Sequence, residues 1–511
     1  MVMPMRLAAR IGMHARDATA LIVAHMDGDE VLDYGALLDG AAGWAARLRA
    51  AGQAQGDTLA VWLPNIAAWP MIELAAAHLG LIVVPVNTRW KAAELRHALA
   101  VSRARLIVMP EEFCGIPFAE ILVEAVEGMA PVDAIRIPLR AERFASAPTA
   151  PVATDLPLNL LTTSGSTGAP KFAVHRQSAL VIRFAAAAER FAVQPGDRML
   201  CILPLCGVWG LGITLAGLMR GAACVLTPLF DPDHGAALME RLAVTHLHGG
   251  DNLILSLLAS PALGSELPAW RTCYFGAFTG RPAAETIAEI EGKGSGALRA
   301  AQAYGSSEGL AFVTGSAPAA PPAERALAGG PLVDDATELR VVDGELQLRG
   351  PTVTSGYFQD EQATAHAFTP DGWYRTGDLG HVVPGGGVFV SRIGDALRLR
   401  GNLVHASEIE HHLCAHPDIV EAHVVGVRDE GRGDLAFAFV KLCQGSIADE
   451  ADLLAFARSR MANYKVPERI FSDIEIPVTV GANGAKVKKG ELRALAEAYL
   501  RQAYLRTPPT T

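Results

Sequence analysis

The chain lacks several features that mark common classes of protein. Its seven cysteines form no CxxC pair, and their odd number leaves one unpaired in any disulfide scheme, which favours a reducing compartment. There is no block of lysine and arginine, and a net charge of −10 argues against nucleic acid as a partner. Repeats and low-complexity tracts are also absent. What is present is a chain of 511 residues, 50% of them hydrophobic, which predicts at least two folded domains.

One uncharged stretch, residues 199–219, is long enough by hydropathy to be a candidate membrane span. Pro204 and four glycines favour a strand, a turn and a buried helix instead: Gly207, Gly210, Gly212 and Gly217. We therefore expect no membrane span and a cytoplasmic location.

The segment TTSGSTGAPK, from Thr162 to Lys171, concentrates hydroxyls, glycines and one lysine. Backbone N–H groups, hydroxyl donors and a fixed positive charge together suit a polyphosphate. It is not a Walker A motif, because Gly165 and Gly168 are three apart and Phe172 follows the lysine. Strand-like residues on both sides predict a hairpin-type nucleotide loop between two buried strands. Taken alone, a Ser/Gly linker would explain the segment equally well.

Further motifs follow in order: YGSSEG (304–309), GWYRTGDLG (372–380) and SRIGDALRLRGNLVHASEIE (391–410). Together with the loop they resemble the core motifs of the AMP-forming acyl-CoA synthetase family, which includes luciferases and peptide-synthetase adenylation domains. GDTLAVWLPN (56–65) resembles the opening sheet of that family, and NGAKVKKGEL (483–492) resembles its closing signature. Several motifs in the same order are hard to obtain by chance.

The resemblance implies an α/β fold with a large N-terminal domain of mostly parallel sheets, flanking helices and a small β-barrel-like subdomain. A small α+β lid domain would follow. Alternating apolar and alanine-rich amphipathic stretches agree with repeated βα units. We expect the AMP-binding (adenylation) domain at 1–392, a hinge near 393–395 and the mobile lid at 396–511. Gly394 stands where relatives usually have Asp or Lys, which keeps backbone freedom but loses side-chain contacts.

A carboxylate resists nucleophilic attack because it is negatively charged and oxide is a poor leaving group. Attack of the carboxylate on the α-phosphate of ATP, with loss of pyrophosphate, gives an acyl-adenylate from which a thiol displaces AMP. The resemblance therefore implies an ATP-dependent carboxylic acid:CoA ligase that uses ATP, Mg²⁺ and CoA. The alternative is a stand-alone adenylating enzyme that loads a carrier-protein pantetheine or releases acyl-AMP. A non-catalytic nucleotide sensor would be expected to lack Lys486 or Glu308, and both are present.

The resemblance also implies roles for single residues. Lys486 would be the cation at the α-phosphate, because the closing signature fits the lysines at 486, 488 and 489 in one register only. Glu308 would hold Mg²⁺ together with Thr167, and Ser307 would donate to the α-phosphate. The β- and γ-phosphates would lie against Thr163, Ser164, Gly165, Ser166, Thr167, Gly168 and Lys171.

For the nucleoside, Tyr304 with Gly305 would stack on adenine, Asp378 would accept both ribose hydroxyls, and Arg392 would meet the ribose from the hinge side. Each of these residues alone is explained by a turn or a solvated charge. Their joint order favours the site. Gly401 and Leu403 would border the channel for CoA.

The carboxylic acid would bind beside the apolar stretch near 199–219, in a pocket to which the resemblance assigns Cys206, Gly207, Trp209, His248, Asp251 and Gly276. Relatives commonly have an aromatic-His pair where Cys206 and Gly207 stand, so Trp209 could substitute or the pocket could be wider. His246, His248 and Asp251 resemble a metal cluster. No third ligand follows the His-x-His pair at a recognised zinc spacing, however, so we expect no metal there. An aliphatic or aromatic acid of moderate size fits this segment, and both monomers and homodimers occur in the family.

Overall fold

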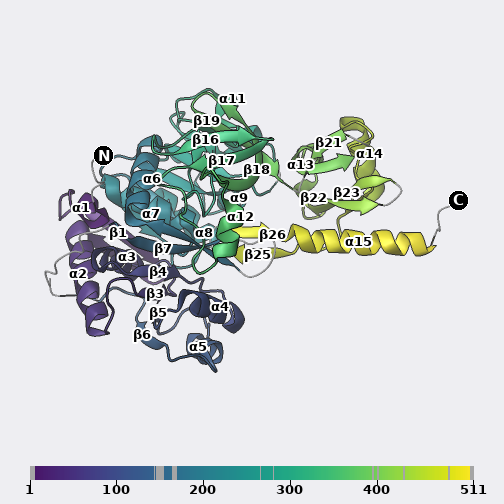
Figure 1. Ribbon diagram of the computed structural model, residues 1–511. Helices are drawn as coiled ribbons and strands as arrows, with labels where there is room; N and C mark the ends of the chain where they lie inside the picture. Colours follow the sequence, from purple (N-terminus) through teal and green to yellow (C-terminus); the bar gives the residue numbers. More distant parts are fainter. Residues whose placement is uncertain are drawn as a thin grey trace.

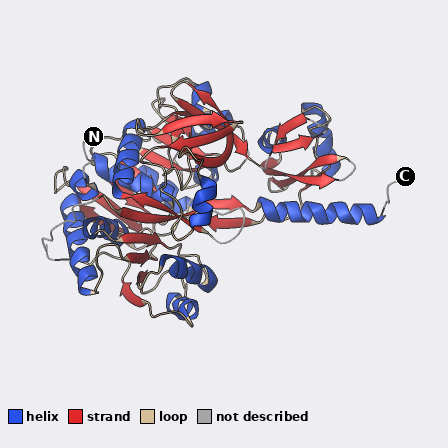
Figure 2. Cartoon of the chain, in the orientation of Figure 1, coloured by secondary structure: helices blue, strands red, loops and turns tan. Residues whose placement is uncertain are grey.

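The computed structural model describes residues 6–142, 144, 155–163, 170–264, 266–279, 281–393, 396–399, 402–429, 432–481 and 484–506. A large N-terminal body carries three sheets, and a smaller C-terminal domain lies to one side of it (Figure 1). Helices flank the sheets, as Figure 2 shows. The predicted α/β class is confirmed.

The first sheet has eight strands in the order β14-β13-β12-β11-β9-β10-β1-β2. The strands are β1 (Thr19–His25), β2 (Gly28–Asp33), β9 (Arg198–Cys201), β10 (Ala223–Leu226), β11 (His246–Gly250), β12 (Thr272–Gly276), β13 (Arg299–Tyr304) and β14 (Thr314–Gly315). Its inner pairs are parallel, and β2 and β14 run antiparallel at the edges. Because parallel strands need crossovers, helices connect them: α7 (Val208–Arg220), α8 (Pro232–Arg241), α9 (Asp251–Leu258) and α10 (Ala283–Glu291). The carboxyl ends of β11, β12 and β13 therefore lie along one edge of the sheet.

The second sheet has six strands in the order β6-β5-β3-β4-β7-β8 and is parallel except for the β7–β8 pair. The strands are β3 (Thr58–Val61), β4 (Ile82–Pro85), β5 (Leu106–Pro110), β6 (Asp133–Ile137), β7 (Pro157–Thr163) and β8 (Lys171–Arg176). Its helices are α3 (Ala68–Leu79), α4 (Ala92–Ser102) and α5 (Phe118–Val126), and α1 (Leu7–Ile11), α2 (Tyr34–Ala50) and α6 (Gln177–Arg190) lie in the same body. One hydrophobic cluster contains buried residues of both sheets and of α3, α6 and α7. Burial of this shared core holds the two sheets together.

Helix α7 shows how local sequence allows this packing. It follows extended Gly207 and ends at Gly221, whose φ of 80° is the left-handed conformation typical of a helix C-terminus. A Cβ at Gly210 would lie 2.3 Å from the carbonyl oxygen of Pro204, and one at Gly212 would lie 2.5 Å from the ring of Phe184. The glycines therefore permit close approach. The predicted strand, turn and buried helix over 199–219 are confirmed, and no helix within the described ranges is long and apolar enough to cross a membrane.

The third sheet is antiparallel, in the order β15-β19-β18-β17-β16. It comprises β15 (Gly329–Pro331), β16 (Glu338–Val342), β17 (Glu345–Arg349), β18 (Tyr374–Val383) and β19 (Gly386–Arg392), with α11 (Pro322–Arg325) and α12 (Glu361–Ala367) nearby in the chain. It forms the small subdomain expected as barrel-like, with β15 and β16 at its edges.

The C-terminal domain has its own sheet and hydrophobic clusters. Its strands are β20 (Ala396–Leu399), β21 (Asn402–His405), β22 (Ile419–Asp429), β23 (Gly433–Leu442) and β24 (Arg469–Phe471), and a separate hairpin joins β25 (Val478–Gly481) to β26 (Gly484–Val487). The helices are α13 (Ala406–Cys414), α14 (Glu450–Arg460) and α15 (Lys489–Arg506). Leu492, Ala496 and Leu500 of α15 pack against β22 and β23. The expected hinge residues 394 and 395 lie outside the described residues, so the domain boundary stays a prediction.

Candidate active site

The hydroxyl-rich loop connects two neighbouring antiparallel strands. Thr163, the last residue of β7, pairs with Lys171, the first residue of β8, and most of β7 is buried. The predicted hairpin between strands is thus confirmed. The residues at the centre of the loop lie outside the described residues: Ser164, Gly165, Ser166, Thr167 and Gly168.

Ser307 connects the YGSSEG motif to both strands that flank this loop. Its Oγ donates to the carbonyl of Thr162, 145 positions away in the sequence, at 2.9 Å. Its carbonyl oxygen accepts from Nε2 of His175 on β8 at 2.8 Å. Because a carbonyl can only accept, Nε2 carries the proton, and burial lowers the pKa of His175 to about 4, so the ring is neutral. Two motifs far apart in the sequence are therefore joined at one place.

The backbone after Glu308 is strained. Leu310, Ala311 and Phe312 all have positive φ, at 57°, 48° and 24°. Such conformations cost about 1–3 kcal/mol each in non-glycine residues and persist only where neighbours enforce them. Gly305 is one such neighbour, because a Cβ there would lie 2.5 Å from the backbone of Ala311.

Arg183 on α6 holds the end of this turn. Its Nη1 donates to the carbonyl of Phe312 at 3.1 Å and forms a buried ion pair with Asp334 at 2.6 Å. Nη2 donates to the hydroxyls of Thr337 and Thr352. Burial lowers the pKa of Arg183 to about 10, so the guanidinium remains charged at neutral pH. A buried charge thus fixes the turn that presents Glu308.

Glu308, Lys171 and Tyr357 meet beside the loop. The Tyr357 hydroxyl donates to Oε1 of Glu308 at 3.0 Å, and Nζ of Lys171 lies 5.2 Å from the centroid of the same ring. No group of three or more His, Cys, Asp and Glu side chains suited to a metal occurs in the part of the chain that the structure describes. A single carboxylate nevertheless fits Mg²⁺, which commonly takes one or two carboxylates and completes its shell with phosphate oxygens and water.

Tyr304, Asp378 and Arg392 form a second group. The Tyr304 hydroxyl donates to Oδ2 of Asp378 at 2.7 Å, and Nε of Arg392 lies 2.9 Å from Oδ1. Asp378 is 2% exposed, and the Tyr304 ring stacks on Phe389 at 5.6 Å. Burial raises the pKa of Tyr304, so it stays a phenol and acts as the donor. The structure brings these three residues together, and their contacts with adenine and ribose stay predictions.

Around the expected acid pocket, Trp209 covers Gly276. A Cβ at Gly276 would lie 3.1 Å from the Trp209 ring, whose edge meets Phe312 at a centroid distance of 5.9 Å. Cys206 and Gly207 stand at the start of α7, and burial raises the pKa of Cys206 to about 12, so its thiol is not a nucleophile.

Asp251 and His248 have structural partners. Asp251 is 1% exposed and accepts from the backbone N–H of Phe278 at 2.8 Å and from the Thr279 hydroxyl at 2.6 Å, which fixes the loop after β12. His248 is fully buried, and its Nδ1 accepts from the N–H of Tyr274 at 2.9 Å. Burial lowers the pKa of His248, so it is neutral. Both side chains therefore have structural partners, and their contact with the acid stays a prediction.

In the C-terminal domain, Lys486 lies on β26 opposite Thr479, and its side chain is outside the described residues. Gly401 and the side chain of Leu403 are also outside them. The competing lysines have acidic partners, since Lys488 pairs with Glu491 and Lys489 with Glu410. The domain touches the N-terminal body where Sγ of Cys414 lies 3.9 Å from the carbonyl oxygen of Thr279.

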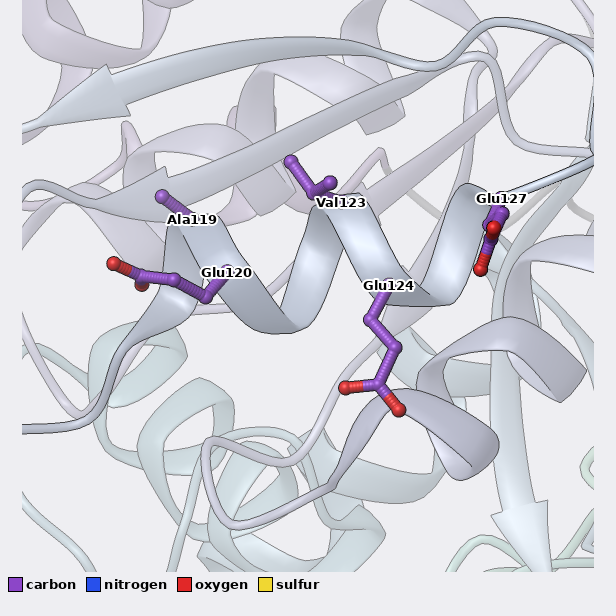
Figure 3. A pocket seen from close by; sticks show the side chains of 5 residues that line it. All are labelled: Ala119, Glu120, Val123, Glu124 and Glu127. Carbon is purple, nitrogen blue, oxygen red and sulfur yellow. The ribbon is translucent and has the colours of Figure 1, made fainter.

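A surface hollow of about 640 Å³ on α5 is not part of this site. Figure 3 shows its lining side chains, Ala119, Glu120, Val123, Glu124 and Glu127. All five come from α5 and the residue that follows it. The charged groups among them are carboxylates, which would repel a phosphate.

Sequence reasoning missed Tyr357, Arg183 and His175. Tyr357 follows a glycine in a segment without a strand pattern, and Arg183 is one basic residue in an amphipathic helix. A lone His after a β-like run is also unremarkable. Long-range contacts alone reveal all three.

Comparison with known proteins identifies the family. Residues 8–358 match the model of the AMP-binding enzyme family, and residues 408–480 match the AMP-binding enzyme C-terminal domain. A methyl-dioxo-octahydroindenyl propanoyl:CoA ligase of Mycobacterium tuberculosis is 33% identical, with 94% of this chain and 96% of that protein covered. A 2-succinylbenzoate–CoA ligase of Geobacillus kaustophilus is 31% identical, over 89% and 92%. ATP-bound MatB from Rhodopseudomonas palustris superposes with a TM-score of 0.83, at 25% identity, over 97% of this chain and 99% of that one.

The chain therefore belongs to the AMP-binding family of adenylate-forming enzymes. It is an AMP-forming acid–thiol ligase, which joins a carboxylic acid to CoA at the expense of ATP through an acyl-AMP intermediate.

Proposed function

We propose that the chain activates an apolar carboxylic acid in the cytoplasm, with Glu308 as the Mg²⁺ ligand and Lys486 as the cation of the adenylation step. The observation that supports this most is the double anchoring of Ser307 between Thr162 and His175. It puts Glu308 next to the loop that begins at Thr163, where a triphosphate would lie. All seven cysteines are free thiols, which supports a reducing compartment.

In this proposal the triphosphate binds to the hydroxyl-rich loop and to Lys171. Mg²⁺ would neutralise charge on the phosphate oxygens when bound. Asp378 and Arg392 orient the ribose, and the acid lies beside Trp209 and Gly276 with its carboxylate towards the α-phosphate. Lys486 approaches on the β25–β26 hairpin and stabilises the charge that develops there. The C-terminal domain then rotates, and CoA enters past Gly401 and Leu403.

The aromatic rings around Gly276 support an apolar acid. Trp209 and Phe278 both lie within 3.2 Å of a Cβ built at this glycine, and Phe312 meets Trp209 edge-on. Rings of this kind favour an aryl or alkyl substituent over a charged one, because apolar surface is removed from water.

The function is tested by mixing the protein with ATP, Mg²⁺ and a panel of aryl and alkyl acids, with CoA, with a pantetheinylated carrier protein, or with neither. Pyrophosphate release that depends on the acid, followed by acyl-CoA with free CoA, is the expected result. Thioester formation with the carrier protein but not with free CoA would favour a stand-alone adenylating enzyme that loads a carrier-protein pantetheine. No pyrophosphate with any acid would refute the proposal.

The role of Lys486 is tested by separating the two half-reactions. Lys486→Ala should lower acid-dependent pyrophosphate release by a factor of about 100 or more, because a charge in the transition state loses its partner. The same variant should retain thioester formation from synthetic acyl-AMP and CoA. Lys488→Ala, two positions away, is the matched control and should keep both rates. Equal loss of both half-reactions in the Lys486 variant would contradict the assignment.

A further inference from the structure

Tyr357 is fixed against β8, the strand that follows the hydroxyl-rich loop. The segment around it runs beside β8, with the N–H of Val174 bonded to the carbonyl of Gly356 at 3.0 Å and the N–H of Phe358 bonded to that of Phe172 at 2.9 Å. Tyr357 itself stands opposite Ala173. Its position relative to Lys171, the first residue of β8, is therefore set by backbone hydrogen bonds.

From this position one side chain meets two opposite charges. The hydroxyl donates to Oε1 of Glu308 at 3.0 Å, while the ring lies 5.2 Å from the ammonium of Lys171. In that hydrogen bond the phenol is the donor, because an ionised carboxylate can only accept. The hydroxyl of Tyr374 interacts with that of Tyr357.

An ammonium and a carboxylate at the edge of one site attract each other. If they formed a direct ion pair, the lysine would attract a phosphate less strongly, and the carboxylate would attract a cation less strongly. Tyr357 gives each of them a neutral partner instead: a hydroxyl for the carboxylate and an aromatic ring for the ammonium. The hydrogen bond uses Oε1 of Glu308, so Oε2 is the oxygen that would face a cation.

We propose that Tyr357 is a positioning residue that holds Glu308 and Lys171 apart, so that the metal ion and the triphosphate each find a charged partner already oriented. The inference rests on the proposed roles of Glu308 and Lys171. It assigns to Tyr357 no contact with the reacting atoms, and its effect passes through the two charged side chains.

Tyr357→Phe isolates the hydroxyl, because the ring beside Lys171 is retained. The readout is binding of Mn²⁺, in place of Mg²⁺, to the enzyme with an ATP analogue that cannot be cleaved between the α- and β-phosphates, followed by electron paramagnetic resonance. We expect the dissociation constant of Mn²⁺ to rise about tenfold, as for the loss of a hydrogen bond to a charged group. Tyr357→Leu removes the ring as well and should also weaken binding of the analogue without metal.

Tyr34→Phe is the matched control. Its hydroxyl is also buried and donates to the carbonyls of Leu218 and Ala222, and within the described residues it has no hydrogen bond to Glu308 or Lys171. It should leave the affinity for Mn²⁺ unchanged. Thioester formation from synthetic acyl-AMP should be retained in Tyr357→Phe, which reports that the fold is intact.

An affinity for Mn²⁺ in Tyr357→Phe equal to that of the wild type overturns the inference, whatever the activity. The proposed function fails separately, if the wild-type protein releases no pyrophosphate with any acid. A weaker affinity for Mn²⁺ in Tyr357→Phe, with wild-type affinity in Tyr34→Phe, supports the positioning role whether or not pyrophosphate is released.

Discussion

Glu73 allows a sharp test of how burial controls a charge in this protein. It lies on α3, fully buried in the main hydrophobic core, and its Oε2 accepts from Nδ2 of Asn159 at 3.2 Å. Burial raises the pKa of Glu73 from 4.5 to about 8, against a smaller opposite effect of Asn159. The carboxyl is therefore protonated in the folded chain at pH values where it is ionised in the unfolded chain.

The sign of the pH dependence follows. The folded state binds the extra proton, so the stability due to Glu73 is complete below pH 4.5 and is lost as the pH rises through about 8. Each pKa unit corresponds to about 1.4 kcal/mol, so the wild type should lose roughly 3 kcal/mol between about pH 5.5 and 8.5 through this one group.

Glu73→Gln removes this dependence, because glutamine never ionises and its carbonyl still accepts from Asn159. Urea unfolding of wild type and variant at pH 5.5 and 8.5 is the assay. The free energy of unfolding of the variant minus that of the wild type should be about 3 kcal/mol larger at pH 8.5 than at pH 5.5. Glu120→Gln, at an exposed position of α5, is the control and should follow the wild type. Parallel pH curves for wild type and Glu73→Gln would refute the reasoning.

Two other substitutions test the acid pocket and the strained turn. Trp209→Ala should shift kcat/KM towards longer or bulkier acids by about tenfold, because removal of the ring opens the space at Gly276; unchanged ratios across an acid panel would place the pocket elsewhere. Arg183→Met should cost about 3–5 kcal/mol in urea unfolding, because it leaves Asp334 buried without its counter-charge. Adding Asp334→Asn should recover part of that loss, because the change removes the buried charge while the side-chain oxygen still accepts from the N–H groups of Ala336 and Thr337; a double variant no more stable than the single one would contradict the argument.

The sequence predicted what depends on local pattern. The β7–β8 hairpin and the strand and helix over residues 199–219 each arise from residues close together in the chain. The resemblance of ordered motifs also brought Tyr304, Asp378 and Arg392 to one place, as the structure has them.

Other parts of the site depend on contacts that no local pattern contains. Tyr357 reaches Glu308 because its segment pairs with a strand more than a hundred positions earlier. The positive φ values at Leu310, Ala311 and Phe312 come from constraints by Gly305 and Arg183, and three such residues in a row run against intrinsic preference. Asp251, which the sequence suggested for the acid pocket, accepts hydrogen bonds from Asn252 on its own helix and from Phe278 and Thr279 after β12, and no local pattern indicates these partners.

The loop after β12 joins the proposed acid pocket to the C-terminal domain. Gly276 starts it, Asp251 fixes Thr279 within it, and Thr279 meets Cys414 of α13. A substrate too large for the space under Trp209 would press on a segment that contacts the C-terminal domain, which we propose to rotate. Discrimination between acids would then be felt in the speed of domain rotation as well as in the strength of binding, and a poor substrate could be held tightly yet turned over slowly.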